Sequence, residues 1–136
     1  MKIGLDIHGV VDKYPNFFAE MTELFVAAGH QVHVITGSTL RQDHPKGIEN
    51  LKFIKENLCI SYTHIFSIVD FQEEIGTEIT YPDDSDNPWM DGEAWDRTKG
   101  DYCRKHKIDI MLDDTQRYSK YFDTPFVQFQ SIVSEK

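Results

Sequence analysis

The feature that most constrains the fold of this chain is a regular alternation of short apolar runs with helical patterns. Between the apolar runs, apolar residues recur every three or four positions, as they do on the inward face of a helix. Strands that alternate with helices of about ten residues or more predict a mainly parallel sheet with helices on both faces. We therefore expect a doubly wound, Rossmann-like α/β fold. Its five strands are predicted at residues 2–7, 31–35, 64–69, 108–112 and 125–129.

The helices have recognisable start and stop signals. The first is expected to begin at Pro15 and to stop at Gly29, and the second begins near Pro45. A third covers residues 93–106, and a short helix covers residues 116–121. The inward stripe of the second helix is expected to comprise Ile48, Leu51, Ile54 and Leu58.

Residues 70–92 interrupt this alternation. The segment contains two prolines, two glycines and many acidic residues, and it lacks helical periodicity. A short hairpin is compatible with residues 77–81. Since loops of this length in compact domains are usually functional or disordered, we interpret the segment as an insertion that could act as a lid. The whole chain of 136 residues fits a single domain, residues 1–136.

Composition excludes several classes of function. The net charge of −9 argues against a nonspecific nucleic-acid binder and against a membrane-surface binder, because both of those partners are anionic. No apolar run approaches the roughly 20 residues of a membrane span, and the opening MKIGLDIHG is too short and too charged for a signal peptide. Cys59 and Cys103 form no CxxC pair, which indicates reduced thiols. These features predict a cytoplasmic protein.

Polar residues follow three of the predicted strands. Asp6 and His8 come after the first strand, Thr36 after the second, and Asp113 and Asp114 after the fourth. The carboxyl ends of parallel strands meet at one edge of the sheet, where ligands bind in folds of this class. We therefore expect these side chains to lie together.

Carboxylates that converge in this way repel one another and need a cation. Oxygen ligands suit Mg²⁺, which would in turn recruit a phosphate oxygen. The hydroxyl of Thr36 and the backbone N–H groups near Gly9 and Gly37 could hold the other phosphate oxygens. Lys99 is the best candidate for a cationic side chain at this site, because it lies on the helix that leads into the fourth strand.

Together these residues resemble the four motifs of the haloacid dehalogenase superfamily of phosphohydrolases. The stretch DIHGV at residues 6–10, followed by Asp12, resembles the first motif. Thr36 resembles the second, Lys99 the third, and LDDT at residues 112–115 the fourth. The match covers most of the chain, and the motifs occur in the order of the family.

The resemblance implies a role for each residue. Asp6 would attack phosphorus and form an aspartyl-phosphate, which divides one difficult step into two easier ones. Thr36 and Lys99 would bind the transferring phosphoryl group, with Gly9 and Gly37 as further substrate-binding positions. Mg²⁺ would be held by Asp6, by the main-chain oxygen of His8, and by Asp113 or Asp114 or both.

His8 departs from the pattern of the family. Phosphohydrolases of this kind usually carry a second aspartate there, which protonates the leaving group and then activates water. General acid–base catalysis is typically worth about 10²- to 10⁴-fold, and a histidine with an ordinary pKa of about 6.5 can take either role. Two interpretations of His8 stay open, and both apply whether the histidine is natural or engineered. Either His8 works as the acid/base, or the chain is a catalytically impaired domain that binds a phosphorylated ligand or partner.

The substrate class follows from the missing cap domain. Only a few residues join the first strand to the first helix, and segment 70–92 is too small for a full cap. The chain therefore resembles a capless or minimally capped member of the superfamily. An open site would suit a bulky phosphomonoester, including a nucleotide, or a small substrate if a second copy of the chain supplies the roof. A receiver-type phosphorylation switch is disfavoured, because its acidic pair would follow the first strand.

Most of the remaining polar and aromatic residues are assigned structural or surface roles. Arg41 is interpreted as solvated, although it could reach a substrate, and Asp12 as a cap of the turn that precedes the first helix. The acidic residues of segment 83–91 indicate a solvated turn. Tyr81 and Trp89 either pack the loop onto the domain or, if the loop covers the strand ends, form an aromatic wall. The histidines without metal-ligand spacing are assigned structural or surface positions: His30, His33, His44, His64 and His106.

Overall fold

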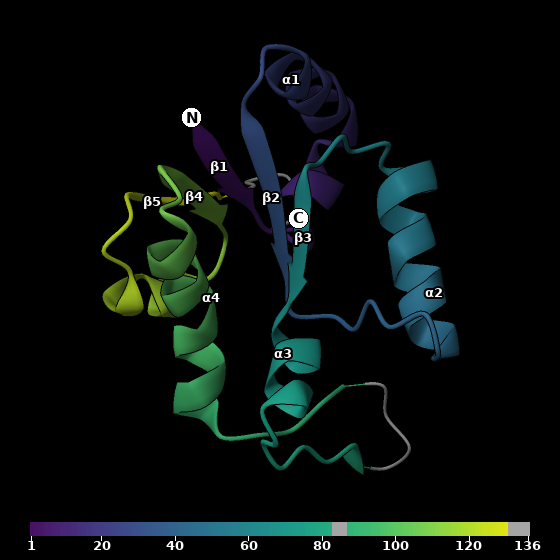
Figure 1. Ribbon diagram of the computed structural model, residues 1–136, viewed down its shortest axis with the longest axis vertical. Helices are drawn as coiled ribbons and strands as arrows, with labels where there is room; N and C mark the ends of the chain where they lie inside the picture. Colours follow the sequence, from purple (N-terminus) through teal and green to yellow (C-terminus); the bar gives the residue numbers. More distant parts are fainter. Residues whose placement is uncertain (83–86, 131–136) are drawn as a thin grey trace.

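The computed structural model describes residues 1–82 and 87–130 (Figure 1). Every pair of neighbouring strands is parallel, and the strand order is β3-β2-β1-β4-β5. The predicted five-stranded α/β fold is confirmed. Asp83, Asp84 and Asp86 of the predicted acidic turn lie outside the described residues. The strands are β1 (Lys2–Leu5), β2 (Gln31–Thr36), β3 (His64–Ser67), β4 (Ile110–Asp113) and β5 (Phe126–Gln128).

Helices cover both faces of this sheet, and α2 and α4 lie on opposite sides of it in Figure 1. Short 3-10 helices, η1 (Val11–Lys13) and η4 (Gln116–Tyr121), follow β1 and β4, and a π-helical turn, η2 (Phe53–Asn57), continues α2. No helix of the described part of the chain is long and apolar enough to cross a membrane. The α-helices are α1 (Pro15–Ala27), α2 (Pro45–Lys52), α3 (Ile68–Glu74) and α4 (Gly92–His106).

The alternation of side chains along β2 divides the core into two layers. Val32 and Val34 pack with Phe18 of α1, which is fully buried. Ile35 points to the other face and packs with Cys103 of α4. Successive side chains of a strand point to opposite faces, so a strand such as β2, which is buried on both faces, requires helices on both sides.

The predicted third strand is too long. β3 ends at Ser67, and the apolar residues Ile68 and Val69 begin α3 instead of continuing the strand. The Ser67 hydroxyl accepts a hydrogen bond from the backbone N–H of Asp70 at 3.2 Å, which caps the new helix. A short apolar run has the same appearance in a strand and in a buried helical turn. The prediction that segment 70–92 contains no helix is therefore wrong for residues 70–74.

The rest of that segment pairs differently from the prediction. Residues 77–81 form no hairpin of their own. Thr80 pairs with Trp89 in an isolated antiparallel bridge, with backbone N–H to oxygen distances of 2.9 and 2.7 Å in the two directions.

The inward stripe of α2 also differs from the prediction at one position. Ile48 is 50% exposed, whereas Gly47 beside it is buried. A Cβ atom at Gly47 would overlap the backbone of Arg41, so the glycine lets the two segments approach closely. The buried line therefore runs through Gly47, with Ile54 and Leu58 further on. Hydrophobic periodicity misses this line because glycine contributes no apolar signal.

Candidate functional site

Three of the predicted acidic residues meet at the carboxyl ends of β1 and β4. Asp6 directly follows β1, and its backbone N–H donates to the carbonyl oxygen of Leu112 in β4 at 3.0 Å. Asp113 is the last residue of β4, and Asp114 follows it. Carboxylate oxygens of Asp6, Asp113 and Asp114 all lie within 4.8 Å of one another. The parallel sheet thus brings together acids from both ends of the chain.

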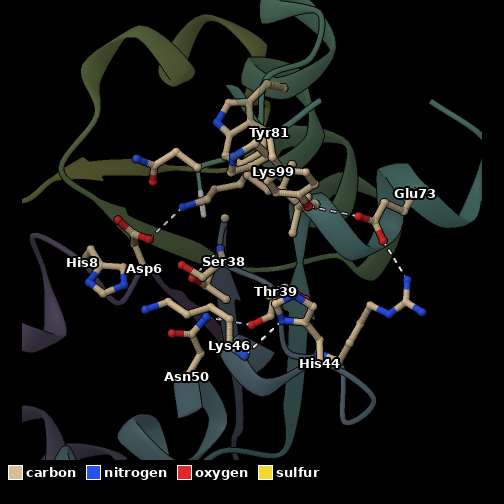
Figure 2. Close-up of a pocket in the computed structure, with 18 of the residues that line it drawn as sticks. Asp6, His8, Ser38, Thr39, His44, Lys46, Asn50, Glu73, Tyr81 and Lys99 are labelled. Atoms are coloured by element: carbon tan, nitrogen blue, oxygen red, sulfur yellow. Dashed lines mark hydrogen bonds and ion pairs between the residues drawn. The ribbon is translucent and has the colours of Figure 1, made fainter. Parts of the chain in front are cut away.

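Lys99 joins this cluster from the face of the sheet that α4 covers. It lies one turn before the buried Cys103 on the inward side of α4. Its Nζ donates to Asp6 Oδ1 at 2.9 Å and to Asp113 Oδ2 at 2.7 Å, and the side chain is 3% exposed (Figure 2). A lysine is rarely buried so deeply unless it is paired, as it is here.

Burial is the largest influence on the pKa values of Asp6 and Lys99 in this cluster. Burial raises the pKa of Asp6 from 3.8 to about 7, because a carboxylate removed from water is disfavoured. The Lys99 ammonium opposes that shift, and the Asp113 carboxylate adds to it. Burial acts to lower the pKa of Lys99, but Asp6 and Asp113 together hold that pKa above its ordinary value. The cluster therefore combines a firmly charged ammonium with three carboxyl groups.

Gly9 is needed because of the tight turn after β1. Its φ angle is +88°, and a Cβ atom at this position would overlap the Asp114 carboxylate. Its backbone N–H donates to Asp12 Oδ1 at 2.8 Å. Asp12 therefore stabilises the turn by accepting a hydrogen bond from its backbone, in keeping with the structural role predicted for it. Asp114 packs directly against the same turn.

Thr36 ends β2 and is 1% exposed, and its hydroxyl accepts a hydrogen bond from the Ser38 backbone N–H at 3.3 Å. The following residue, Gly37, lies against the indole of Trp95, and a Cβ atom there would come within 2.8 Å of the ring. The Trp95 ring N–H donates to the Tyr118 hydroxyl at 3.0 Å. This pair fixes an aromatic wall beside the carboxyl end of β2.

His8 lies at the mouth of the site rather than inside the carboxylate cluster. Its side chain is 62% exposed, and its Nδ1 is 3.4 Å from Asp12 Oδ2. Figure 2 shows the imidazole on the same side of the pocket as Asp6. His8 and the predicted nucleophile Asp6 therefore line the same cavity. The assignment of its main-chain oxygen as a metal ligand stays a prediction.

A cavity of about 950 Å³ opens above these residues. Its floor includes Asp6, Thr36 and Lys99, which are all buried. One part of the wall comes from the loop after β2 and from α2, and another part is aromatic. Tyr81 borders the cavity, whereas Trp89 is 67% exposed and borders a second, smaller cavity, so the aromatic-wall alternative would apply to Tyr81 and not to Trp89. Residues higher on the walls include Arg41, His44, Lys46, Asn50, Glu73, Tyr81, Trp95 and Tyr118.

Hydrophobic periodicity gave no reason to place α2 at this cavity. Arg41, expected to be solvated, is half-exposed but is held by Asp43 at 2.7 Å and by Glu73 at 2.8 Å. Glu73 also accepts a hydrogen bond from the Tyr81 hydroxyl at 3.1 Å. Lys46 joins the cavity from the first turn of α2. The one available signal was the position of α2 directly after the polar loop that follows Thr36.

No protein-family model matches this chain, and no curated protein matches it. The functional assignment therefore depends on the four motifs and on the geometry of the site.

Proposed function

We propose that this protein is a magnesium-dependent phosphohydrolase of the haloacid dehalogenase type, which hydrolyses phosphomonoesters through an aspartyl-phosphate on Asp6. The observation that carries the proposal is the convergence of Asp6, Lys99 and the Asp113–Asp114 pair beneath one cavity. A nucleophilic carboxylate, a buried cation and further acids at one sheet edge are what phosphoryl transfer requires, since its catalysis is mainly positioning and electrostatics. Nucleotides and other bulky phosphomonoesters are the substrates that such a cavity would suit.

The residues of the cluster fit a divalent cation. Three carboxyl groups face one ammonium, so the cluster keeps an excess of acidic groups, and its donors are all oxygens. Asp6, Asp113 and Asp114 would hold Mg²⁺, together with the main-chain oxygen of His8. When bound, the ion would supply positive charge beside the transferring phosphoryl group.

The first step would form the aspartyl-phosphate. Lys99 binds Oδ1 of Asp6, so we assign Oδ2 as the oxygen that attacks phosphorus. The new bond joins Asp6 Oδ2 to phosphorus, and the bond from phosphorus to the leaving-group oxygen breaks. Lys99 and the Thr36 hydroxyl would hold the phosphoryl oxygens. His8, as imidazolium, would give a proton to the leaving oxygen.

The second step would release phosphate. Water would attack phosphorus and give one proton to the neutral imidazole of His8, and the bond between phosphorus and Asp6 would break. The products are inorganic phosphate and the regenerated Asp6 carboxylate. The exposed position of His8 in the lining of the same cavity as Asp6 supports its assignment to both proton transfers.

A second candidate function is phosphate-ligand binding without turnover. The observation that favours it is the loose attachment of His8, whose Nδ1 lies 3.4 Å from Asp12 Oδ2. An imidazole held so weakly is poorly oriented for proton transfer. In that case the domain would bind a phosphorylated ligand or partner through the same cluster.

Phosphate release from phenyl phosphate, measured between pH 5 and 9 with and without Mg²⁺, tests both functions. We expect the wild type to release phosphate only with Mg²⁺, and Asp6→Asn to lose at least about 10⁴-fold in kcat. Asp101→Asn is the matched control, because Asp101 lies on the exposed side of α4. Equal release by Asp6→Asn would contradict the proposal. A silent wild type that becomes active as His8→Asp would favour the second function.

A further inference from the structure

We propose that the substrate carries a second anionic group, which Lys46 binds on the α2 side of the cavity. The inference rests on the proposed phosphohydrolase function, because that function places the phosphoryl group at the floor beside Asp6. It narrows the substrate class to phosphomonoesters whose leaving group bears a carboxylate or a further phosphate.

The cations of the cavity differ in how they are paired. Of the described residues that line the cavity, three are lysine or arginine. Lys99 contacts two carboxylates at 2.7 and 2.9 Å, and Arg41 contacts two at 2.7 and 2.8 Å. Lys46 is different, because its ion pair is to Glu49 at 3.7 Å, and the Glu49 side chain is 72% exposed. Such a long, exposed ion pair contributes little stabilising free energy. The Lys46 ammonium therefore remains able to bind an anionic ligand.

The groups that line the cavity lie at different depths. Asp6, Thr36 and Lys99 form the floor and are 7%, 1% and 3% exposed. The Lys46 side chain is 38% exposed and belongs to the wall. Figure 2 shows it extending from the start of α2 toward the side of the pocket where Asp6 and His8 lie. A group on this wall meets the part of the substrate beyond the phosphoryl group, which is the leaving group.

Hydrogen bonds at the start of α2 hold Lys46 in place. The His44 imidazole caps α2 and accepts a hydrogen bond from the Lys46 backbone N–H at 3.0 Å. Asn50 lies one turn further along the same face of α2 and also lines the cavity. Its amide donates to the Thr39 carbonyl oxygen at 3.0 Å, which ties α2 to the loop after β2. Lys46 therefore projects from an anchored helix start.

The two acids of the same wall do not oppose an anion there. Arg41 donates to both Asp43 and Glu73, and the ion pair of Lys46 is to Glu49 instead. The two cations of this wall balance its two acids in charge, and the Lys46 ammonium is the cation that neither acid holds. A carboxylate or phosphate of the substrate could form a charge-assisted hydrogen bond with this ammonium.

The experiment compares esters that differ only in a second charge. The probes are phenyl phosphates with a carboxylate at the 3 or the 4 position and the matched, uncharged carboxamides. We expect the wild type to prefer at least one carboxylate ester over its carboxamide by about tenfold in kcat/KM, as one charge-assisted hydrogen bond would give. Lys46→Met should abolish this preference, and Lys46→Arg should keep it. Lys52→Met, on the same helix but outside the cavity, is the control and should behave as wild type.

The outcomes separate the two proposals. Turnover of all the esters without a carboxylate preference in the wild type would overturn the inference and leave the phosphohydrolase in place. So would a Lys46→Met variant that loses activity equally on charged and uncharged esters, because that result means a structural or phosphoryl-contacting role. No release from any ester by the wild type or by His8→Asp would overturn the proposed function, and the inference with it.

Discussion

The inward side of α4 serves two buried polar clusters of opposite character. At the carboxyl end of the sheet, Lys99 pairs with Asp6 and Asp113, and this cluster is charged and borders the cavity. One turn further along α4, Tyr102 packs against His33 of β2, in a cluster that lies toward the amino ends of the strands. The same helix and the same sheet therefore support one charged centre and one neutral centre.

In the neutral centre, both ring nitrogens of His33 have hydrogen-bond partners within the protein. His33 is 1% exposed, its Nδ1 lies 2.7 Å from the Tyr102 hydroxyl, and its Nε2 lies 2.9 Å from Gln31 Oε1. Its ring stacks on His64 with centroids 4.2 Å apart. Burial lowers the pKa of His33 to about 4, and the nearby His64 and His106 add to that shift. Both ring nitrogens are occupied, so no atom of this imidazole is left for a ligand.

The difference teaches which buried polar groups point to function. A cluster in which every donor and acceptor has a partner stabilises one packing arrangement and needs nothing else. The charged centre has more carboxyl groups than cations and opens to a cavity, so it would gain from a bound cation or substrate. Burial alone does not separate the two centres, whereas the balance of partners does.

The largest expected effect is the loss of the buried ammonium. Lys99→Met would leave Asp6 and Asp113 buried without their shared cation, which typically costs about 3–5 kcal/mol of unfolding free energy. Urea unfolding should show this loss, while Arg104→Met, which removes two exposed ion pairs on the same helix, should stay within about 1 kcal/mol of wild type. If Lys99→Met does not fold, the double variant Lys99→Met/Asp113→Asn should recover part of the stability. A Lys99→Met protein as stable as wild type would show that the charged centre does not depend on this pairing.

The neutral centre should respond to acid. The pKa of His33 is about 4 in the folded state and about 6.5 in the unfolded chain, so the unfolded chain takes up the proton at the higher pH. Its contribution is therefore complete above pH 6.5 and is lost as the pH falls toward 4, by about 3 kcal/mol in all. The groups around this imidazole are His64 of β3, Tyr102 and His106 of α4, and Lys2 of β1, and none of them supplies a negative charge to offset the proton.

The measurement is the unfolding free energy of wild type and of His33→Phe at steps between pH 4 and 7. The variant should be less stable at pH 7, because Tyr102 and Gln31 lose their partner, and its stability should fall less as the pH drops. His30→Gln, a histidine outside this cluster, should keep the wild-type slope. Parallel pH profiles for wild type and His33→Phe would show that His33 is not the group that senses acid.

The contrast between the two centres also shows what sequence could predict. The meeting of Asp6, Thr36 and Asp113 follows from a general rule, since strand ends in a parallel sheet share an edge. The contacts of His33 and the position of Lys46 follow no such rule, because they depend on how α4 and α2 pack. Three-dimensional packing decides these contacts, and one-dimensional periodicity does not carry that information.

α3 was missed for a related, local reason. The run from His64 to Val69 is mainly apolar, and its division into strand and helix is marked by one capping hydrogen bond at Ser67. Gly47 shows the same limit in another form, since its role is to allow close approach to the backbone of Arg41. Signals of this kind depend on a single atom or on its absence, so a window of hydrophobicity cannot detect them.

The smallest expected effect sharpens the claim that the charged centre is incomplete without a cation. Mg²⁺ at about ten times its dissociation constant should stabilise the wild type by about 1.4 kcal/mol, because the ion binds the folded carboxylate cluster and not the dispersed acids of the unfolded chain. Thermal unfolding with MgCl₂, against NaCl of equal ionic strength, measures this gain. Asp114→Asn should lose most of it, since Asp114 is the exposed member of the cluster and is not bound by Lys99.

Asp109→Asn is the matched control for this measurement. Asp109 accepts a hydrogen bond from the Lys2 backbone N–H at the opposite end of the sheet, so its removal should leave the gain from Mg²⁺ intact. A gain that NaCl reproduces, or one that survives in Asp114→Asn, would mean that the ion screens the overall negative charge of the chain. The charged centre would then be balanced by Lys99 alone, and the distinction between the two centres would disappear.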